Sequence, residues 1–262
     1  MSGVRSLALR STSAADDLGY LGQQAIAQAM SEGQDYRIIG GHMTRLLLAA
    51  YPTEAAIPRS TLDADAAIGD VEVIGPLAAD LLEQDFTKER ANKFVKAVEG
   101  GEVEINLLLP RHENPHAGLR TRTVEGVGAV DTLPELSWAL LGEPLVLDVS
   151  ATLRDGRTLE YRTLIPDLEV AVVLKAHAWR ARRSQKDGDL ADLQTLFEIR
   201  HAHPEAPWRL QEPPLRGYRR DAARILSELS RTVTRRAPGY RVPPHLDGKR
   251  LAALIQRHVQ SS

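Results

Sequence analysis

The sequence predicts an α+β protein in which a mixed, partly antiparallel sheet flanked by helices is followed by a helical lobe. Strand-like and helix-like segments alternate through the first 165 residues, and from Pro166 onward apolar residues recur at helical spacing. We find no internal repeat. Mixed elements followed by helices alone are typical of an α+β fold with a separate helical part. We therefore expect one lobe over residues 1–165 and a helical lobe over 166–262.

Composition supports an ordered globular chain and restricts its chemistry. The 262 residues are 43% hydrophobic and 26% charged, which suits two lobes that each bury a core. The chain contains no cysteine, which excludes disulfides, thiolate zinc sites and cysteine nucleophiles. A metal ion would have to be bound by carboxylates, histidines or carbonyl groups, and hard oxygen ligands favour magnesium or manganese.

The N-terminal segment lacks the apolar core of a signal peptide, since it mixes arginine with serine and threonine. No run approaches the roughly 18 apolar residues that a membrane span needs. We expect a soluble, cytoplasmic protein without a membrane partner.

The net charge of −2 combines two oppositely charged regions. Carboxylates gather in the first half, at Asp63, Asp65, Asp70, Glu72, Asp80, Glu83 and Asp85. Basic residues gather near the C-terminus, at Arg216, Arg219, Arg220, Arg224, Arg231, Arg235, Arg236, Arg241, Lys249, Arg250 and Arg257. This asymmetry fits a metal-dependent enzyme that acts on a polyanion, although a basic run alone is also typical of a solvated helix surface.

The first elements predict a place where a phosphate group could approach the backbone. A helix is expected over 14–30, a strand over 36–39 and a second helix over 43–50, before Pro52. Gly40-Gly41 separates that strand from the second helix. Glycines allow close approach of backbone, and a helix N-terminus offers unpaired amides to an anion.

The next strand carries the main chemical signal. Residues 60–68 alternate, so Thr61, Asp63 and Asp65 share one strand face. An Asp-x-Asp pair alone often belongs to a turn, but aspartate is poorly suited to a strand interior. Two aspartates on one face therefore call for a cation or basic partners.

Later segments complete the predicted fold. A hairpin turn is expected at Asp155-Gly156 and a connector over 204–214. We expect helices over 76–84 and 88–99, strands over 102–109, 145–153 and 158–164, and helices over 168–179, from 189, over 219–234 and over 248–260.

Clustered carboxylates that hold divalent ions roughly 4 Å apart are what phosphoryl and nucleotidyl transfer require. The pair Asp63 and Asp65 meets the first part of that requirement. Other chemistries find less support, because neither Gly-Gly pair continues into a phosphate-binding loop and no serine nucleophile motif is present. The loop histidines are interpreted as surface residues: His112, His116, His201 and His203.

Two blocks of sequence resemble a known superfamily. Ile39-Gly40-Gly41-His42, followed by a helix and Arg59-Ser60-Thr61-Leu62-Asp63-Ala64-Asp65, resembles the signature of the DNA-polymerase-β-type nucleotidyltransferases. Leu174-Lys175-Ala176-His177-Ala178-Trp179-Arg180 and Lys186-Asp187-Gly188-Asp189-Leu190-Ala191-Asp192-Leu193 are similar to the AbiEii-like branch, the bacterial toxins that include the MenT enzymes. The resemblance spans roughly residues 36–200 and implies a nucleotidyltransferase lobe over 1–165.

The resemblance implies roles for individual residues. Gly40, Gly41 and His42 would approach the nucleotide, Asp63 and Asp65 would bind Mg²⁺ or Mn²⁺, Lys175 would contact the triphosphate, and Asp189 or Asp192 would orient basic groups between the lobes. The residues alone also allow a lysine that snorkels along an amphipathic helix and aspartates that serve a helix start.

The chain departs from this pattern at three places. His42 replaces the usual serine or threonine, so its ring would have to donate to a phosphate. The stretch before Asp63 is long, which implies an extended loop around 52–58. Asn106 stands where a third carboxylate is usual, and Glu104, two residues earlier on the same face, could take that role as a metal ligand.

These observations leave three functions open. The first is transfer of a nucleoside monophosphate from an NTP to an acceptor with release of pyrophosphate. In the toxin branch the acceptor can be the 3′ end of tRNA and the antitoxin is a separate protein; another RNA acceptor is also compatible with the basic lobe. The second is a degenerate nucleotidyltransferase fold that binds a nucleotide or partner without catalysis. The third is a nucleotidyltransferase that modifies a small molecule.

Overall fold

The computed structural model describes residues 3–30, 34–56, 59–90, 92–112, 120–182, 187–235, 243 and 246–260. Contacts divide the chain into two units, each considered by itself below. The first unit comprises residues 1–50 and 60–166, and the second comprises residues 51–59 and 167–262. Residues 51–59 thus group with the C-terminal helices. The predicted division into 1–165 and 166–262 instead assigned this segment to the first lobe.

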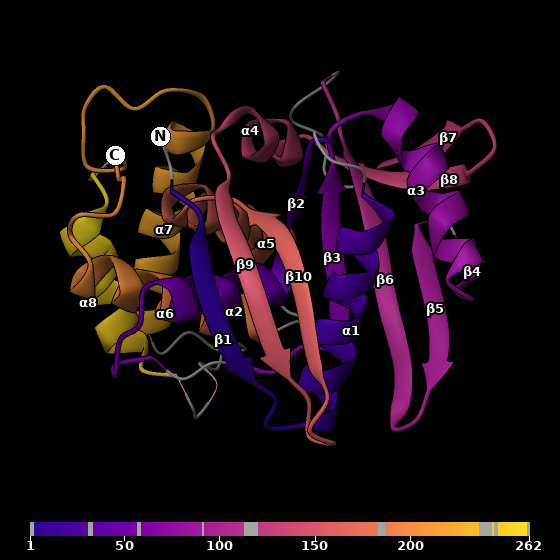
Figure 1. The fold of residues 1–262 in the computed structure, drawn as a ribbon. Coiled ribbons are helices and arrows are strands. Elements are labelled where there is room, and N and C mark those ends of the chain that lie inside the picture. Colours follow the sequence, from indigo (N-terminus) through magenta and orange to yellow (C-terminus); the bar gives the residue numbers. More distant parts are fainter. Residues whose placement is uncertain are drawn as a thin grey trace. The chain divides into compact units, whose positions relative to one another are not determined.

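The larger sheet of the first unit is mixed (Figure 1). Its strands, in spatial order, are β2 (Tyr36–Ile38), β3 (Asp63–Ile68), β6 (Gly101–Pro110), β5 (Lys93–Val98) and β4 (Thr87–Arg90), and β8 (Gly128–Leu133) and β7 (Arg120–Val124) extend it. The central pair β3 and β6 is parallel, β2 pairs antiparallel with β3, and β5 pairs antiparallel with both β4 and β6. The predicted mixed sheet is confirmed.

A smaller sheet contains a parallel pair and a hairpin. Its order is β1 (Arg5–Arg10), β9 (Leu145–Thr152) and β10 (Thr158–Ile165). The hairpin between β9 and β10 turns at Asp155-Gly156 as predicted, and Gly156 has a φ of 90°, where a side chain would be strained. Strand β1 was not predicted, because its short alternation becomes a strand only through pairing with β9.

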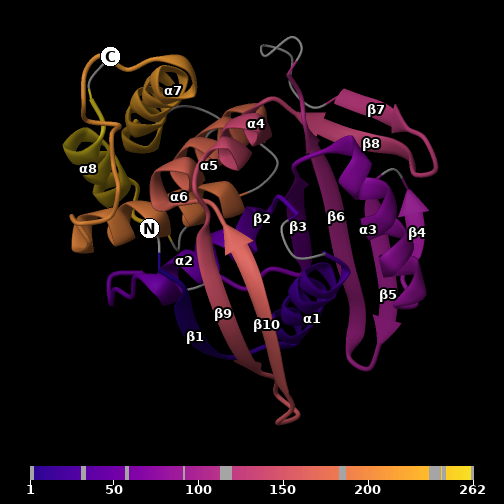
Figure 2. The same cartoon turned by 45° about the horizontal axis from the view of Figure 1, so that its top comes forward.

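The described residues of the first unit form the helices α1 (Ala14–Ala29), α2 (Gly40–Ala50), α3 (Val71–Glu83) and α4 (Glu135–Leu141). Ser13 caps α1 by accepting a hydrogen bond from the amide of Asp16. Helix α1 packs against β6 and β3 of the larger sheet and against β10 of the smaller one (Figure 2). Its buried face, which includes Leu18, Ala25 and Ile26, joins the two sheets into one core.

The predicted helix over 88–99 is wrong, because this segment forms the β4–β5 hairpin. Within β5 the buried Phe94 lies between partly exposed neighbours, a period of two that suits pairing with β6. Helix α3 begins five residues before the predicted start at Pro76, because Asp70 caps it and its apolar face extends back to Ile74.

The second unit is helical, as predicted. Its helices are α5 (Leu168–Arg182), α6 (Gly188–Ala202), α7 (Gly217–Thr234) and α8 (Gly248–His258). Helix α6 packs with α5 and α8, and α7 packs with α5 and α8, around buried residues such as Leu193, Phe197 and Leu226. Within the described residues, none of the helices has the length and apolar character needed to cross a bilayer.

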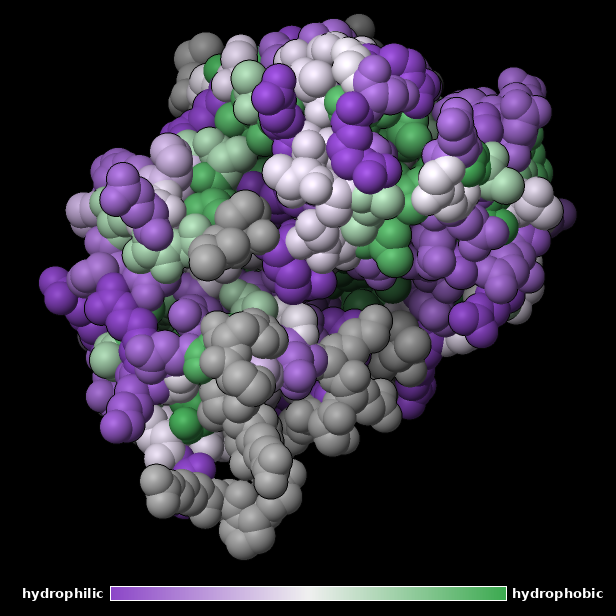
Figure 3. Space-filling model, turned by 90° about the horizontal axis from the view of Figure 1, so that it is seen from below, coloured by the Kyte–Doolittle hydropathy of each residue, from purple (hydrophilic) through white to green (hydrophobic). Residues whose placement is uncertain are grey.

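Hydrophilic residues make up much of the surface seen in Figure 3. Large hydrophobic side chains that are exposed in the described part of the chain are Val4, Leu62, Leu82 and Leu141. Scattered apolar residues of this kind are normal on a protein surface.

Candidate active site

Asp63 and Asp65 lie on the same face of β3 in the first unit. Both are partly exposed, whereas Ala64 and Ala66 between and after them are completely buried on the opposite face. The predicted alternation therefore describes this strand correctly from Asp63 onward. The preceding residues 60–62 lie outside the strand.

The parallel register places polar residues of β6 beside the two aspartates. Asp63 pairs with Glu104, and Asp65 pairs with Asn106. Since paired residues on adjacent strands project to the same side, these four side chains share one sheet face. The structure thus brings together both predicted metal ligands of β3 and both candidate residues of β6.

Gly40 lies against the second aspartate. The amide of Ile39 donates to the carbonyl oxygen of Asp65 at 2.9 Å, which ties the end of β2 to β3. Gly40 has a φ of 69°, and a side chain there would collide with Asp65 Oδ2. Glycine is therefore required both by backbone conformation and by space. Gly41 follows in the first turn of α2 and is partly exposed.

Each aspartate accepts a hydrogen bond from an uncharged side chain. Thr61 Oγ1 donates to Asp63 Oδ1 at 2.8 Å, and Asn106 Nδ2 donates to Asp65 Oδ1 at 3.0 Å. These contacts orient the two carboxylates without neutralising them. The sequence predicts neither hydrogen bond: it places Thr61 on the same face, and it gives Asn106 as an uncharged residue in the position of a third carboxylate, able to offer a carbonyl oxygen to a metal.

Glu104 is paired with a lysine. Lys93 Nζ lies 3.0 Å from Glu104 Oε2 and 2.9 Å from Glu89 Oε2. The hydrogen bonds that Lys93 donates to Glu89 and Glu104 raise the pKa of Lys93, so this ammonium group stays charged. Among the described residues, no group of three acidic, histidine or cysteine side chains is arranged to hold a metal ion. The structure thus shows Asp63 and Asp65 as a carboxylate pair and Glu104 ion-paired with Lys93, and the role of Glu104 as a third metal ligand stays a prediction.

His42 faces the protein interior. Its side chain is buried, and its Nδ1 lies 3.0 Å from Gln23 Nε2, while Tyr161 Oη donates to Gln23 Oε1 at 3.3 Å. Gly19 of α1 makes room for the ring, because a side chain at that position would collide with it. The placement does not support direct donation from the His42 ring to a phosphate; the ring instead braces α2 against α1.

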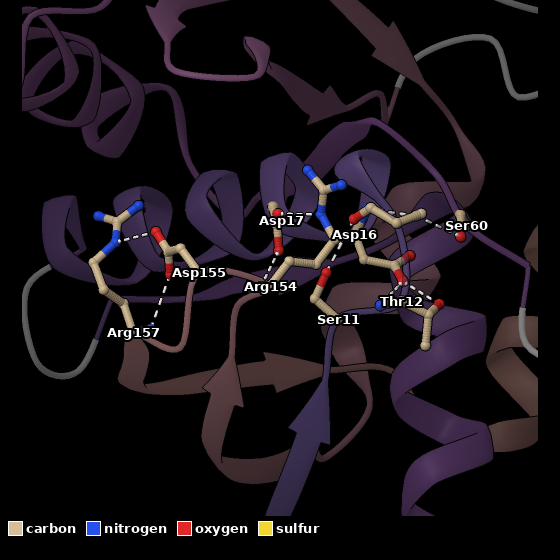
Figure 4. Close-up of polar contacts among 9 residues, drawn as sticks. Ser11, Thr12, Asp16, Asp17, Ser60, Arg154, Asp155 and Arg157 are labelled. Carbon is tan, nitrogen blue, oxygen red and sulfur yellow. Dashed lines mark hydrogen bonds and ion pairs between the residues drawn. The ribbon is translucent and has the colours of Figure 1, made fainter.

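The segment before Asp63 is anchored by a hydrogen-bonded carboxylate (Figure 4). Asp16 is buried and accepts 2.8 Å hydrogen bonds from the amide and the hydroxyl of Thr12. Burial alone would raise the pKa of Asp16, but hydrogen bonds from Ser60, Thr12 and Arg45 hold it far below its usual value. Because Ser60 precedes Thr61, this network fixes the backbone that leads to the aspartate pair.

Lys175, Asp189 and Asp192 meet in the second unit. Lys175 Nζ lies 2.5 Å from Asp192 Oδ2 and 3.5 Å from Asp189 Oδ1, and all three side chains are buried. The snorkelling alternative for Lys175 is therefore wrong. Burying three charges is costly unless they are paired, and such clusters are frequent at functional sites.

Two arginines complete this cluster. Arg59 donates through Nε and Nη2 to the two oxygens of Asp192, each at 3.2 Å, and Arg182 binds Asp189 in the same bidentate way at 3.1 and 3.0 Å. Asp189 and Asp192 thus each pair with Lys175 and with an arginine within the second unit, and their role in orienting basic groups between the lobes stays a prediction. Arg182 follows Lys175 by seven residues on α5, a spacing from which its participation could have been predicted.

The remaining predictions concern loops and surface residues. Lys186, His116, Pro58, Arg236 and Arg241 lie outside the described residues. His112 is exposed, and His203 contacts the carbonyl oxygen of Pro52 at 2.9 Å. The candidate residues therefore form two groups, one in each unit: Gly40, Gly41, Asp63 and Asp65 in the first, and Lys175, Asp189 and Asp192 in the second.

Comparison with known proteins gives two solved structures. Neither a protein-family model nor a curated protein sequence matches the chain. An antigenic nucleotidyltransferase-like protein from Paracoccidioides brasiliensis is similar with a TM-score of 0.44 and 16% identity, over 94% of this chain and 95% of that one. The antibiotic-resistance factor ANT(2'')-Ia is similar with a TM-score of 0.37 and 10% identity, over 72% of this chain and 91% of that one.

Proposed function

We propose that this protein is a metal-dependent nucleotidyltransferase that moves a nucleoside monophosphate from an NTP to an acceptor. The observation that supports the proposal is the pair Asp63 and Asp65 on one sheet face with Gly40 against the second carboxylate. Carboxylate oxygens, together with the oxygens of Thr61 and Asn106 nearby, form a donor set that suits Mg²⁺ or Mn²⁺.

The residues divide the work of such a reaction. Asp63 and Asp65 would hold the divalent ion, which when bound stabilises charge on the transferred phosphoryl group. The N-terminus of α2 at Gly40-Gly41 would offer amides to a phosphate. Lys175, held by its two aspartates, is our candidate for the triphosphate contact. The acceptor oxygen bonds to the α-phosphorus, pyrophosphate leaves, and the acceptor proton passes to solvent.

We also propose an RNA acceptor, for which the 3′ end of tRNA is the first candidate, and a separate antitoxin as protein partner. Both follow from the resemblance of the sequence blocks around Lys175 and Asp189 to the AbiEii-like toxins. The many exposed arginines of the second unit support a polyanionic acceptor.

The decisive experiment is incubation with each α-labelled NTP, Mn²⁺ and total RNA, followed by a denaturing gel. We expect labelled RNA with the unmodified protein and a loss of at least 100-fold with Asp63→Asn or Asp65→Asn, because each removes a charged metal ligand. Asp148→Asn, at a partly exposed aspartate of β9 that pairs with Arg162, serves as the control and should retain activity. Label in a small product would favour the small-molecule acceptor, and full turnover in either β3 variant would refute the assignment.

A second candidate is a nucleotide-binding protein without catalysis. It is favoured by Asn106 in the place of a carboxylate and by the pairing of Glu104 with Lys93, which together leave two aspartates for the cation. A thermal-shift screen separates the candidates. Stabilisation by NTP that requires Mg²⁺ or Mn²⁺ supports the enzyme, and stabilisation without metal supports the binding protein.

A further inference from the structure

Helix α7 carries a row of exposed arginines, here called the arginine stripe. Three members lie within the helix and follow one another along its surface, and the first and last occupy its N-cap and C-cap positions. The members are Arg216, Arg220, Arg224, Arg231 and Arg235. All five are exposed, and the side chains of Arg220 and Arg224 are 69% and 66% exposed. The 18-residue helix gives the stripe a length of about 27 Å.

Few carboxylates neutralise the stripe. Asp221 lies 3.9 Å from Arg220 and 3.8 Å from Arg224, near the limit of an ion pair, and it is shared between them. Arg231 donates to the carbonyl oxygen of Ser227. Within the described part of the chain, Arg216 and Arg235 have no carboxylate close enough for an ion pair. The stripe is therefore a local excess of positive charge on a chain whose net charge is −2.

The arginines at the start of α7 oppose the stability of the helix. Arg216 occupies the N-cap without a capping hydrogen bond, and the first turn contains no acidic residue. A helix N-terminus favours negative charge, and like charges four residues apart repel, each by a few tenths of a kcal/mol. One shared carboxylate, Asp221, partly offsets this repulsion at Arg220 and Arg224 but leaves the start of α7 with more positive than negative charge, which favours an external anion.

The other side of α7 packs in the protein core. Ala222, Ile225, Leu226 and Leu229 are buried, and the helix packs against α5 and α8 (Figure 2). A basic amphipathic helix that binds a membrane needs its apolar face free to enter the lipid. The apolar face of α7 is covered, so a ligand would meet only the charged side.

We propose that the arginine stripe of α7 binds the phosphate backbone of a nucleic acid. Arginine is suited to this because its planar guanidinium group forms bidentate hydrogen bonds with a phosphate group. The proposal deepens the proposed function by placing the contact of a polynucleotide acceptor on α7. Only the statement that the bound nucleic acid is the acceptor rests on the proposed function, because binding itself requires neither NTP nor metal.

The test is fluorescence anisotropy of labelled single-stranded RNA, duplex RNA and single-stranded DNA, titrated with the full chain at 50 to 200 mM salt. If the stripe engages four to five phosphates of a single strand, log Kobs should fall with log[salt] with a slope of about −3, a loss of roughly 60-fold over this range. Arg220→Gln/Arg224→Gln should reduce the slope by about 1.4, because two phosphate contacts disappear.

Two controls identify the origin of the effect. Arg157→Gln changes an exposed arginine of the first unit that Asp155 already neutralises, and it should leave the slope unchanged. Asp63→Asn should bind RNA like the unmodified protein, so failure of catalysis is distinguishable from failure of this proposal. The melting temperature of Arg220→Gln/Arg224→Gln should stay level or rise, whereas an arginine pair needed for folding would lower it.

Three results would overturn the inference: absence of binding to all three nucleic acids at 50 mM salt, an unchanged slope in Arg220→Gln/Arg224→Gln, or preferential binding of the stripe to anionic lipid vesicles. The relative affinities for the RNA strand, the RNA duplex and the DNA strand decide which backbone is the ligand.

Discussion

Asn106 has two properties that an ionised aspartate at the same position would lack. Its amide donates to Asp65, and its neutrality keeps the charge of the face low. In Asn106→Asp this donor is lost and a third carboxylate faces Asp65, so without metal we expect a loss of about 1–3 kcal/mol in the free energy of unfolding. A third hard ligand should also bind Mn²⁺ more tightly.

The prediction for Asn106→Asp is therefore a lower melting temperature without metal and a larger increase on addition of Mn²⁺ than in the unmodified protein. Differential scanning fluorimetry over a Mn²⁺ titration measures both. Asn106→Ala, which removes the amide without adding charge, should show no larger response to Mn²⁺. An equal response in Asn106→Asp and Asn106→Ala would mean that this face does not bind the cation.

Gly40 is a second residue at which a single added methyl group should change the stability of the protein. An alanine there would adopt a left-handed backbone conformation and press its methyl group against Asp65 Oδ2. We expect Gly40→Ala to cost about 1–3 kcal/mol of stability, measured by urea unfolding, and to weaken metal binding.

The matched control for Gly40→Ala is Gly142→Ala. Gly142 has a φ of −79°, which alanine readily adopts, and an added methyl group would meet no atom of a non-neighbouring residue within 4 Å, so the substitution should leave the stability unchanged or raise it by about 0.4–1 kcal/mol. Equal effects of the two substitutions would contradict the close approach of Gly40 to Asp65.

Among the helices, α6 and α8 meet through two histidines. His201 Nδ1 lies 3.3 Å from His258 Nε2, and His258 is buried. Burial, reinforced by the positive charge of Arg200, lowers the pKa of His258 to about 4; His201, Arg257 and Arg250 act in the same direction. Since the unfolded chain binds the proton more readily, stability should fall as the pH drops from about 6.5 towards 4.

We predict that His258→Gln reduces this acid sensitivity. Between pH 7 and 4 the unmodified protein should lose of order 1 kcal/mol more than the variant, as measured by urea unfolding at a series of pH values. His112→Gln, at an exposed histidine, should follow the unmodified protein. Parallel curves for His258→Gln and the unmodified protein would show that His258 protonation does not oppose folding.

Helices and strands were predicted correctly where one hydrophobic periodicity runs through the segment. They were predicted wrongly where pairing with a distant strand determines the conformation. The alternation around Asp63 and Asp65 and the helical spacing after Pro166 define their elements locally. The 88–99 segment is rich in helix-forming Lys, Glu and Ala, and only pairing of β5 with β6 makes it a strand. The short β1 likewise depends on β9.

The candidate site was predictable in part for the same reason. Sequence spacing placed Asp63, Asp65 and Gly40 correctly, because turn and strand geometry are local. The pairing of Glu104 with Lys93 and of His42 with Gln23 depends on contacts between distant segments, which no local pattern reveals.

At the scale of the whole molecule, the two units are not consecutive pieces of chain. Residues 51–59 leave the first unit after α2 and return to it just before β3. On the way, Arg59 pairs with Asp192 and the carbonyl oxygen of Pro52 contacts His203, so this excursion is anchored in the second unit.

This excursion means that the protein cannot be dissected at one point. A fragment that starts at residue 167 would lack Arg59, leaving the buried Asp192 with one cation fewer. A fragment that ends at residue 166 would keep Pro52 and Arg59, whose partners His203 and Asp192 would be gone, between the glycine turn and the aspartate strand. Domain swapping, split-protein designs and limited proteolysis must therefore treat the 51–59 segment as part of the second unit, although the chain on both sides of it belongs to the first.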